Sequence, residues 1–168
     1  MKTKIARALS LAILSTLIFL TGVISAHAAV VLEDVSVGTT EGGSTITIID
    51  HQATGSDRLM LVGVSFNNDS YETITGITFN GVPLTLVGTE ANSDDARVEI
   101  WSLVNPDLGN HDVEITFNAA LYRQAIAGVV TFSGVDQTSP LGTFASAEAD
   151  GNLASVDVPS ATDELVFG

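Results

Sequence analysis

Side-chain oxygens gather in three polar loops of the chain, at residues 67–69, 92–95 and 107–112. Ca²⁺ binds about six to eight oxygens from carboxylates, amides and carbonyls, and none of these loops has helix-loop-helix calcium spacing. Adjacent carboxylates, as at positions 94 and 95, repel each other unless a cation lies between them. We therefore consider Ca²⁺ as a cofactor. The candidate ligands are Asp69, Asn92, Asp94 and Asp95. Asn and Asp also form turns readily, so a structural role stays open at each loop.

The only tryptophan, Trp101, lies in a stretch whose residue types suit sugar binding. Such sites on β-sandwiches place an aromatic ring beside hydrogen-bonding polar groups. In an extended strand Arg97 and Glu99 would share one face with Trp101, and Arg97 could pair with Glu99. Tyr71 is a further ligand-binding candidate, and Tyr122 another aromatic one. The alternative, in which Trp101 packs in the core, stays open.

Catalytic motifs are lacking in the sequence. Beyond residue 28 the only histidines are His51 and His111, there is no cysteine, and neither His-Glu-x-x-His nor Gly-x-Ser-x-Gly occurs. A carboxylate pair such as Glu99 and Glu114 would suit glycoside hydrolysis, but such pairs arise freely in an acidic chain. We therefore expect no enzyme and name no catalytic residue.

The first 28 residues have the pattern of a signal peptide. A basic start is followed by the apolar run Ala8–Ile24, and Ala26 with Ala28 forms a small-residue cleavage site before Ala29. A lipoprotein anchor would need a cysteine, and no later run reaches the ~20 apolar residues that span a bilayer. We expect a secreted or cell-surface protein whose residues 29–168 form a single domain.

Cleavage would leave a strongly acidic chain. Three arginines, Arg58, Arg97 and Arg123, would then face all 20 acidic residues. Such a surface repels nucleic acid and anionic membranes, and it suits cations, neutral glycans or plain solubility. Without cysteine no disulfide can form, so the fold must be held together by burial, alone or together with bound metal.

Short β-strands separated by turns account for most of the chain. Apolar residues at every second position predict half-buried strands, and runs that are apolar on both faces predict central ones. The expected strands are Val30–Val37, Ser44–Asp50, Leu59–Phe66, Ile74–Phe79, Val82–Val87, Arg97–Leu103, 112–117 and Ile126–Phe132, with weaker ones at Gly142–Ala147 and Ala154–Val158. Asn80-Gly81 predicts a type I′ hairpin turn. No extended helical period occurs, so we predict an all-β, antiparallel, jelly-roll-like sandwich.

The last residues, 162–168, echo residues 56–63, where a central strand is expected. On this pattern Glu164 would begin another central strand. We accordingly expect the domain to be truncated at its C-terminal end.

Four segments resemble a known module: DRLMLVGVSF, ITFNGVPLTLVG, DARVEIWSLVNP and GVVTFSGVDQTSPLG. They are similar to a β-sandwich module of bacterial secreted and cell-surface proteins, which often stands beside Ig-like or lectin-like domains. The resemblance covers roughly residue 30 to the end and implies an extracellular jelly-roll-like fold. It brings no catalytic residues, because its motifs are strands and turns.

These observations favour a non-catalytic extracellular binding or adhesion module that takes a glycan or a cell-surface or matrix component and is stabilised by Ca²⁺. A self-assembling structural or fibre subunit is the alternative, since an incomplete sheet exposes unpaired backbone. A glycoside hydrolase accessory or catalytic domain is the third hypothesis. Self-association and further domains in a longer chain are both compatible with the sequence.

Overall fold

The computed structural model describes residues 29–67, 72–92, 96–149, 153–162 and 164–168, and all regular secondary structure in these ranges is β-strand. The strands are β1 (Val31–Glu41), β2 (Thr45–Ala53), β3 (Leu59–Asn67), β4 (Ile74–Phe79), β5 (Val82–Pro83), β6 (Thr85–Ala91), β7 (Ala96–Val104), β8 (Gly109–Phe117) and β9 (Gln124–Ser133). In these ranges no helix is long and apolar enough to cross a membrane.

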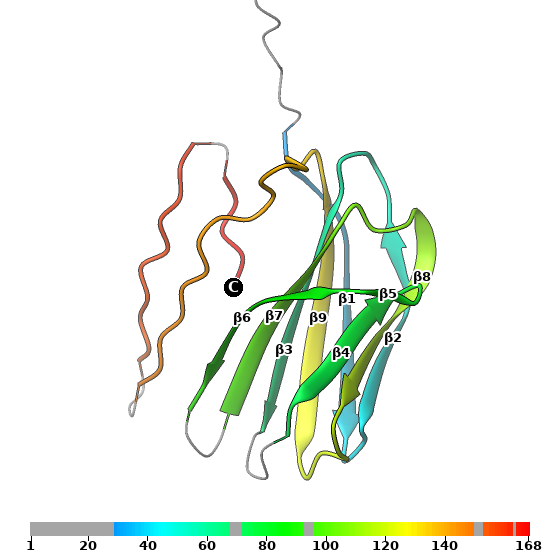
Figure 1. The fold of residues 1–168 in the computed structure, drawn as a ribbon, viewed down its shortest axis with the longest axis vertical. Coiled ribbons are helices and arrows are strands. Elements are labelled where there is room, and N and C mark those ends of the chain that lie inside the picture. The colour runs from blue at the N-terminus through cyan, green and yellow to red at the C-terminus, as the bar shows by residue number, and fades with distance from the viewer. Residues whose placement is uncertain (1–28, 68–71, 93–95, 150–152, 163) are drawn as a thin grey trace, which may run out of the picture.

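The strands form two antiparallel sheets that pack face to face (Figure 1). Sheet A has the order β1-β9-β3-β7-β6, and sheet B has the order β2-β8-β4-β5. From β1 to β4, and again from β7 to β9, consecutive strands alternate between the sheets, in the manner of a jelly roll. The predicted all-β antiparallel sandwich is confirmed.

The core lies between the sheets and follows from the two-residue period of the strands. In β2, Ile46 and Ile48 are buried while the threonines between and beside them are exposed. Sheet A contributes alternate residues of β3 and β9 to the same core. The rings of Phe66 and Phe117 meet edge to face across it, with centroids 5.2 Å apart. β2, β3 and β8 therefore turn an apolar face inward, as their sequences predict. β1 differs, because Val35 and Val37 are exposed while Asp34 and Ser36 contact His51 of the other sheet.

The Asn80-Gly81 hairpin is confirmed, but the strand expected after it is divided. Asn80 and Gly81 have φ angles of 51° and 75°, as a type I′ turn requires. β5 ends at Pro83, and one more backbone hydrogen bond follows, from the Leu84 N–H to the Ile77 carbonyl at 2.9 Å. The chain then crosses to sheet A as β6.

The strands predicted at Gly142–Ala147, at Ala154–Val158 and from Glu164 onward are not formed in the residues that the structure describes. Instead, the C-terminal segment runs over the outer face of sheet A (Figure 1). Phe144 lies against Gly88, and Phe167 packs on an outer apolar cluster. That cluster consists of Leu59, Leu61, Phe132 and Val135, with Val130 beside them. Side-chain contacts hold this segment over the face of the sheet. Its apolar residues are therefore buried by packing on the sheet, and they do not form a strand that is hydrogen-bonded to it.

Candidate functional site

Arg97, Glu99 and Trp101 lie together on the inward face of β7, as their spacing predicts. The Arg97 Nε donates to Glu99 Oε1 at 2.6 Å, and Trp101 Nε1 donates to Glu99 Oε2 at 2.8 Å. Glu99 is only 2% exposed, and Trp101 packs against the core. These three side chains therefore direct polar atoms at one another from within the sandwich. Their role in ligand binding stays a prediction.

The other predicted site residues are distributed as follows. Tyr71, Asp69, Asp94 and Asp95 lie outside the described residues. The Asn92 backbone N–H donates to the Ala96 carbonyl at 3.0 Å and closes the turn between β6 and β7. Asn67 and Ala96 are Cα partners. The chain therefore leaves β3 and enters β7 at the same end of sheet A, so the first two calcium-candidate loops adjoin one end of the sandwich.

The third polar segment, 107–112, follows β7 at the opposite end of the sandwich, and its residues from Gly109 onward belong to β8. Its side chains accept hydrogen bonds from three different partners. Asp107 accepts from the Asn80 amide at 3.1 Å, Asn110 from the Gln52 amide at 3.2 Å, and Asp112 from the Asp50 backbone at 3.1 Å. These contacts match the structural interpretation of this loop. Within the described residues no group of three or more His, Cys, Asp or Glu is placed to hold a metal ion.

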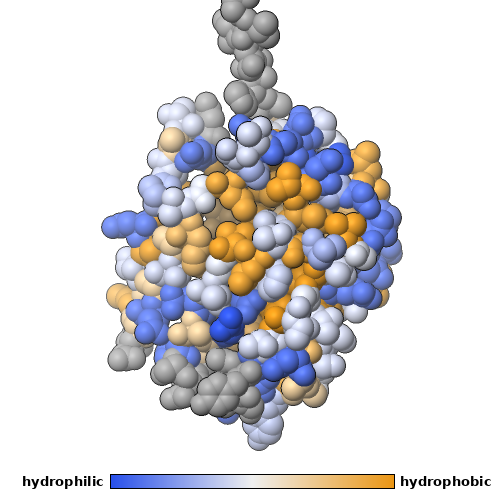
Figure 2. Space-filling view, viewed as in Figure 1, coloured by the Kyte–Doolittle hydropathy of each residue, from blue (hydrophilic) through white to orange (hydrophobic). Residues whose placement is uncertain are grey.

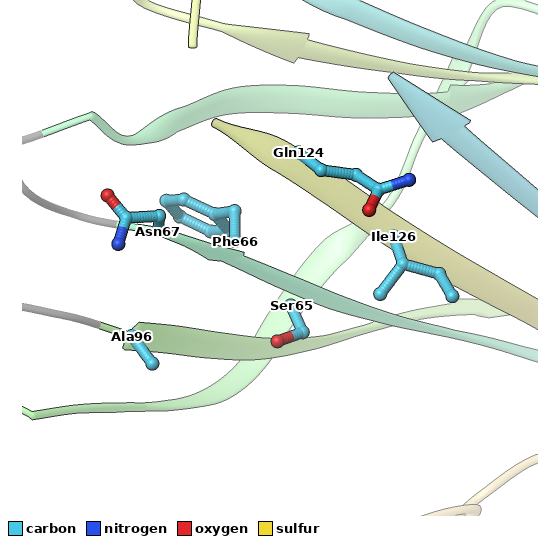
Figure 3. Close-up of a pocket in the computed structure, with 6 residues that line it drawn as sticks. All are labelled: Ser65, Phe66, Asn67, Ala96, Gln124 and Ile126. Atoms are coloured by element: carbon cyan, nitrogen blue, oxygen red, sulfur yellow. The ribbon is translucent and has the colours of Figure 1, made fainter. Parts of the chain in front are cut away.

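A cavity of about 340 Å³ opens on the outer face of sheet A, at the end that carries the first two loops (Figure 3). Its lining residues are Ser65, Phe66, Asn67, Ala96, Gln124 and Ile126. None of the six is charged, although the chain has a formal net charge of −14. Hydroxyl and amide groups from β3 and β9 surround the aliphatic Ile126. We call this the end cavity.

Tyr122 lies in the loop between β8 and β9, two residues before Gln124 of the end cavity. Its side chain is 79% exposed, and the Arg123 guanidinium lies 5.9 Å from the ring centroid. Leu121 anchors the loop: it is buried, and its N–H donates to the Gly43 carbonyl at 3.0 Å. An aromatic ring is therefore presented to solvent at the same end of the sandwich as the end cavity.

The end cavity was not predicted from the sequence. Ser65 is the only hydroxyl of β3, and Ile126 begins an apolar run that predicts a central strand. The two are Cα partners across β3 and β9, and Ile126 is 52% exposed. The polar residue within β3 was the available signal, but only the strand register shows which residue lies beside it.

Buried polar groups join the two sheets at His51. Its Nδ1 lies 3.0 Å from Asp34 Oδ2 and 2.9 Å from Ser36 Oγ, and its Nε2 lies 2.8 Å from Thr131 Oγ1. Because the Asp34 carboxylate only accepts, Nδ1 carries the proton in the neutral ring and Nε2 accepts from the threonine hydroxyl. This order resembles an Asp-His-nucleophile arrangement. Thr131 and His51 are both 0% exposed, so a substrate does not reach the hydroxyl.

The environment of His51 also changes its titration. Burial lowers the pKa of His51 below its ordinary value of 6.5, while the Asp34 carboxylate opposes this shift. Burial would raise the pKa of Asp34, but the hydrogen bond from the Gln52 backbone and the attraction to His51 contribute to an opposite net effect. The pKa of Asp34 therefore lies below its ordinary value of 3.8.

The carboxylates considered for glycoside hydrolysis are on different surfaces. Glu99 faces the interior from sheet A, whereas Glu114 is exposed on β8 of sheet B. A glycosidic bond cannot lie between the two groups. The hydrolase hypothesis therefore has no support from this pair.

Comparison with models of protein families, with curated proteins and with solved structures finds no match to this chain. The resemblance to a bacterial cell-surface β-sandwich module therefore stays a hypothesis that rests on sequence segments, and the candidate site must be argued from its own chemistry.

Proposed function

We propose that this protein is an extracellular, non-catalytic binding module that takes a neutral glycan at the end cavity. The observation that carries the proposal is the composition of this cavity: hydroxyl and amide groups around an aliphatic side chain, without a charged lining residue. Such groups donate to and accept from sugar hydroxyls, while Ile126 covers the apolar face of a sugar ring. Ligand sites commonly combine an apolar surface with a few placed polar groups.

Two neighbouring features support the proposal. The exposed Tyr122 provides an aromatic surface at the same end of the sandwich, where a ring can stack on a sugar. The loops that contain the candidate calcium ligands adjoin this end too, since Asn67 and Ala96 are paired. Any Ca²⁺ held by these candidate ligands would bind chain segments that continue directly from Asn67 and Ala96 of the cavity.

The test is a screen of residues 29–168 against a panel of neutral oligosaccharides, followed by calorimetry with the tightest binder. Gln124→Ala removes an amide from the cavity, and Gln52→Ala removes an exposed amide from β2 as a matched control. We expect Gln124→Ala to weaken binding about tenfold, equivalent to about 1.4 kcal/mol, and the control to leave it unchanged. If the two variants bound the sugar with equal affinity, the sugar site would lie outside the end cavity. If no oligosaccharide of the panel bound, the proposed function would be wrong.

A second candidate function is a self-assembling structural subunit, and one observation favours it. β6 is the edge of sheet A, and no strand pairs with its other side within the described part of the chain. Leu86 on this strand is 42% exposed. An edge that is unpaired, and whose one charged residue is Glu90, accepts a strand from another molecule.

Sedimentation over a range of protein concentrations tests assembly. Leu86→Lys places a charge on the edge strand and should abolish any assembly, whereas Thr47→Lys adds the same charge to the exposed face of sheet B. Protein that stays monomeric at every concentration rules this function out, and equal assembly of the two variants rules out β6 as the contact.

A further inference from the structure

A groove separates residues 144–149, which we call the strap, from the outer face of sheet A. Its volume is about 350 Å³. The sheet contributes Glu90, Asn92, Ala96, Val98 and Ile100, and the strap contributes every residue from Phe144 to Ala149. The strap contacts the sheet through Phe144, whose ring lies against Gly88, and through Ser146, whose hydroxyl donates to Glu90.

The walls of the groove are apolar and incompletely covered. Val98 is 45% exposed on the sheet side, and Ile100 is half-buried. Ala145 and Ala147 are half-buried on the strap side, where their small side chains leave space that larger residues would fill. The space-filling view, seen from the side on which both sheets and the C-terminal segment are visible, shows apolar residues gathered in the middle of the molecule (Figure 2). A groove of this size lies at the lower end of the range for small-molecule sites.

The charged residues of the groove are all acidic. Glu90 and Glu148 carry carboxylates, and no basic residue is among its lining residues. The three arginines of the described residues are engaged elsewhere: Arg58 donates to the Pro106 carbonyl at 2.9 Å, Arg97 to Glu99 at 2.6 Å, and Arg123 lies over Tyr122. An anionic ligand would be repelled here, and a cationic one attracted.

We propose that the groove binds a cationic amphiphile, a molecule with one alkyl chain and an ammonium group. The chain would lie between the strap and the side chains of Val98 and Ile100, where it loses contact with water. The ammonium group would lie near Glu90 and Glu148. The groove shares Ala96 with the end cavity but has otherwise different walls, so the proposal stands apart from glycan binding.

Calorimetry with three octyl compounds below their micelle concentrations tests the proposal on residues 29–168. Octyltrimethylammonium, octyl glucoside and octanoate share the chain length and differ in the charge of the head group. We expect the cationic compound to bind at least tenfold more tightly than the neutral one, and octanoate not to bind. Equal binding of the cationic and anionic compounds would overturn the proposal.

Two variants and their controls locate the site. Ala147→Leu fills the groove and should abolish binding, whereas Ala154→Leu makes the same change at an exposed position outside it. Glu148→Gln should weaken the cationic compound about threefold and leave octyl glucoside unchanged. Glu114→Gln removes a carboxylate from the far sheet and should have no effect.

Unfolding of each variant, followed by Trp101 fluorescence, confirms that it is folded. Normal binding by folded Ala147→Leu would overturn the proposal, and so would equal losses in Glu148→Gln and Glu114→Gln, which would indicate attraction to net charge alone. Gln124→Ala, which alters only the end cavity, should bind octyltrimethylammonium normally. Glycan binding at the end cavity and amphiphile binding in the groove can therefore be tested independently.

Discussion

At the scale of single residues, the hydrogen bonds of Glu99 set its contribution to stability. A buried carboxylate is costly unless it is paired, and Glu99 accepts from both Arg97 and Trp101. Truncation leaves a partly buried guanidinium and an indole N–H without their acceptor. The net contribution of such an ion pair to the free energy of unfolding is small, but removal of one partner destabilises the fold strongly, because the other partner stays buried without its hydrogen bond.

We expect Glu99→Ala to lower the free energy of unfolding by about 3 kcal/mol, and Glu99→Gln, which keeps one acceptor oxygen, by about 1 kcal/mol. Urea unfolding followed by Trp101 fluorescence measures both, because this is the only tryptophan. Glu114→Gln is the control, since that carboxylate is exposed. An unchanged midpoint for Glu99→Ala would show that the three side chains do not act as a unit.

His51 gives stability a pH dependence whose sign follows from burial. Because the folded protein lowers the pKa of His51 below 6.5, the unfolded chain takes up the proton first as pH falls. The contribution is fully present above pH 6.5 and is lost as pH falls through the folded-state pKa. The pKa of Asp34 is also lowered, so Asp34 adds a loss in the same direction below pH 3.8.

Unfolding midpoints in urea between pH 8 and pH 4 should therefore fall as the solution becomes acidic, beginning near pH 6.5. His51→Gln retains hydrogen-bonding groups for Ser36 and Thr131 but does not titrate, so the part of the decline that begins near pH 6.5 should disappear. A wild-type midpoint that stays constant from pH 8 to pH 5 would contradict this account.

At the scale of elements, a row of glycines on the outer face of sheet A decides how the strap packs. Gly88, Gly63 and Gly128 belong to one cross-strand row, in which Ile100 joins the first two. An added Cβ at Gly88 would lie 2.4 Å from the Phe144 ring, whereas one at Gly128 would meet nothing within 4 Å. The register at Gly63 is unbroken, and an added Cβ there would lie 3.9 Å from the Phe167 ring, which is an ordinary van der Waals contact.

Gly88→Ala should displace Phe144 and free the strap, while Gly128→Ala in the same row should leave it in place. Amide hydrogen exchange of residues 141–149 measures this, and we expect it to quicken at least tenfold in the first variant alone. Global stability should change by about 1 kcal/mol or less, because the strap belongs to no ladder. Equal exchange in both variants would show that Phe144 does not anchor the strap.

The same elements show how far the sequence could lead. Period-two patterns, together with runs that are apolar on both faces, were sufficient to predict β1 to β4 and β7 to β9. They failed after Gly134, where apolar residues pack on the outer face of a sheet without joining it. A pattern of apolar residues indicates which side chains are buried. It does not show whether the segment is hydrogen-bonded into a sheet or only packs on the sheet through its side chains.

At the scale of the whole molecule, the candidate sites depend on assembly that a linear pattern does not contain. The Arg97–Glu99–Trp101 arrangement could be predicted because its members are two residues apart on one strand. The end cavity could not, because it needs the register of β3 against β7 and β9 to bring Ser65, Ala96 and Ile126 together. The part of the outer face of sheet A that stays uncovered depends in turn on the path of the C-terminal segment across it.

The strongly acidic net charge is a property of the whole molecule. It must be separated from specific binding when Ca²⁺ is tested as a ligand. Any salt screens repulsion among the acidic residues and stabilises the fold slightly, but only a specific site gives a saturable effect of Ca²⁺ at constant ionic strength. A ligand present at 100 times its Kd stabilises the folded state by about 2.7 kcal/mol. If Asp69, Asn92, Asp94 and Asp95 bind Ca²⁺, titration at fixed ionic strength should raise Tm to a plateau that Mg²⁺ does not reproduce.

The double variant Asp94→Asn, Asp95→Asn should lose this plateau and keep the general effect of salt, because it removes two ligands and the repulsion between them. Asp107→Asn with Asp112→Asn makes the same change of charge at two carboxylates that already accept hydrogen bonds within the sandwich. That control should keep the plateau. A Tm that depends on ionic strength alone, in wild type and both variants, would assign all of these side chains to turns and to the acidic surface, and glycan binding at the end cavity would then have to proceed without a metal.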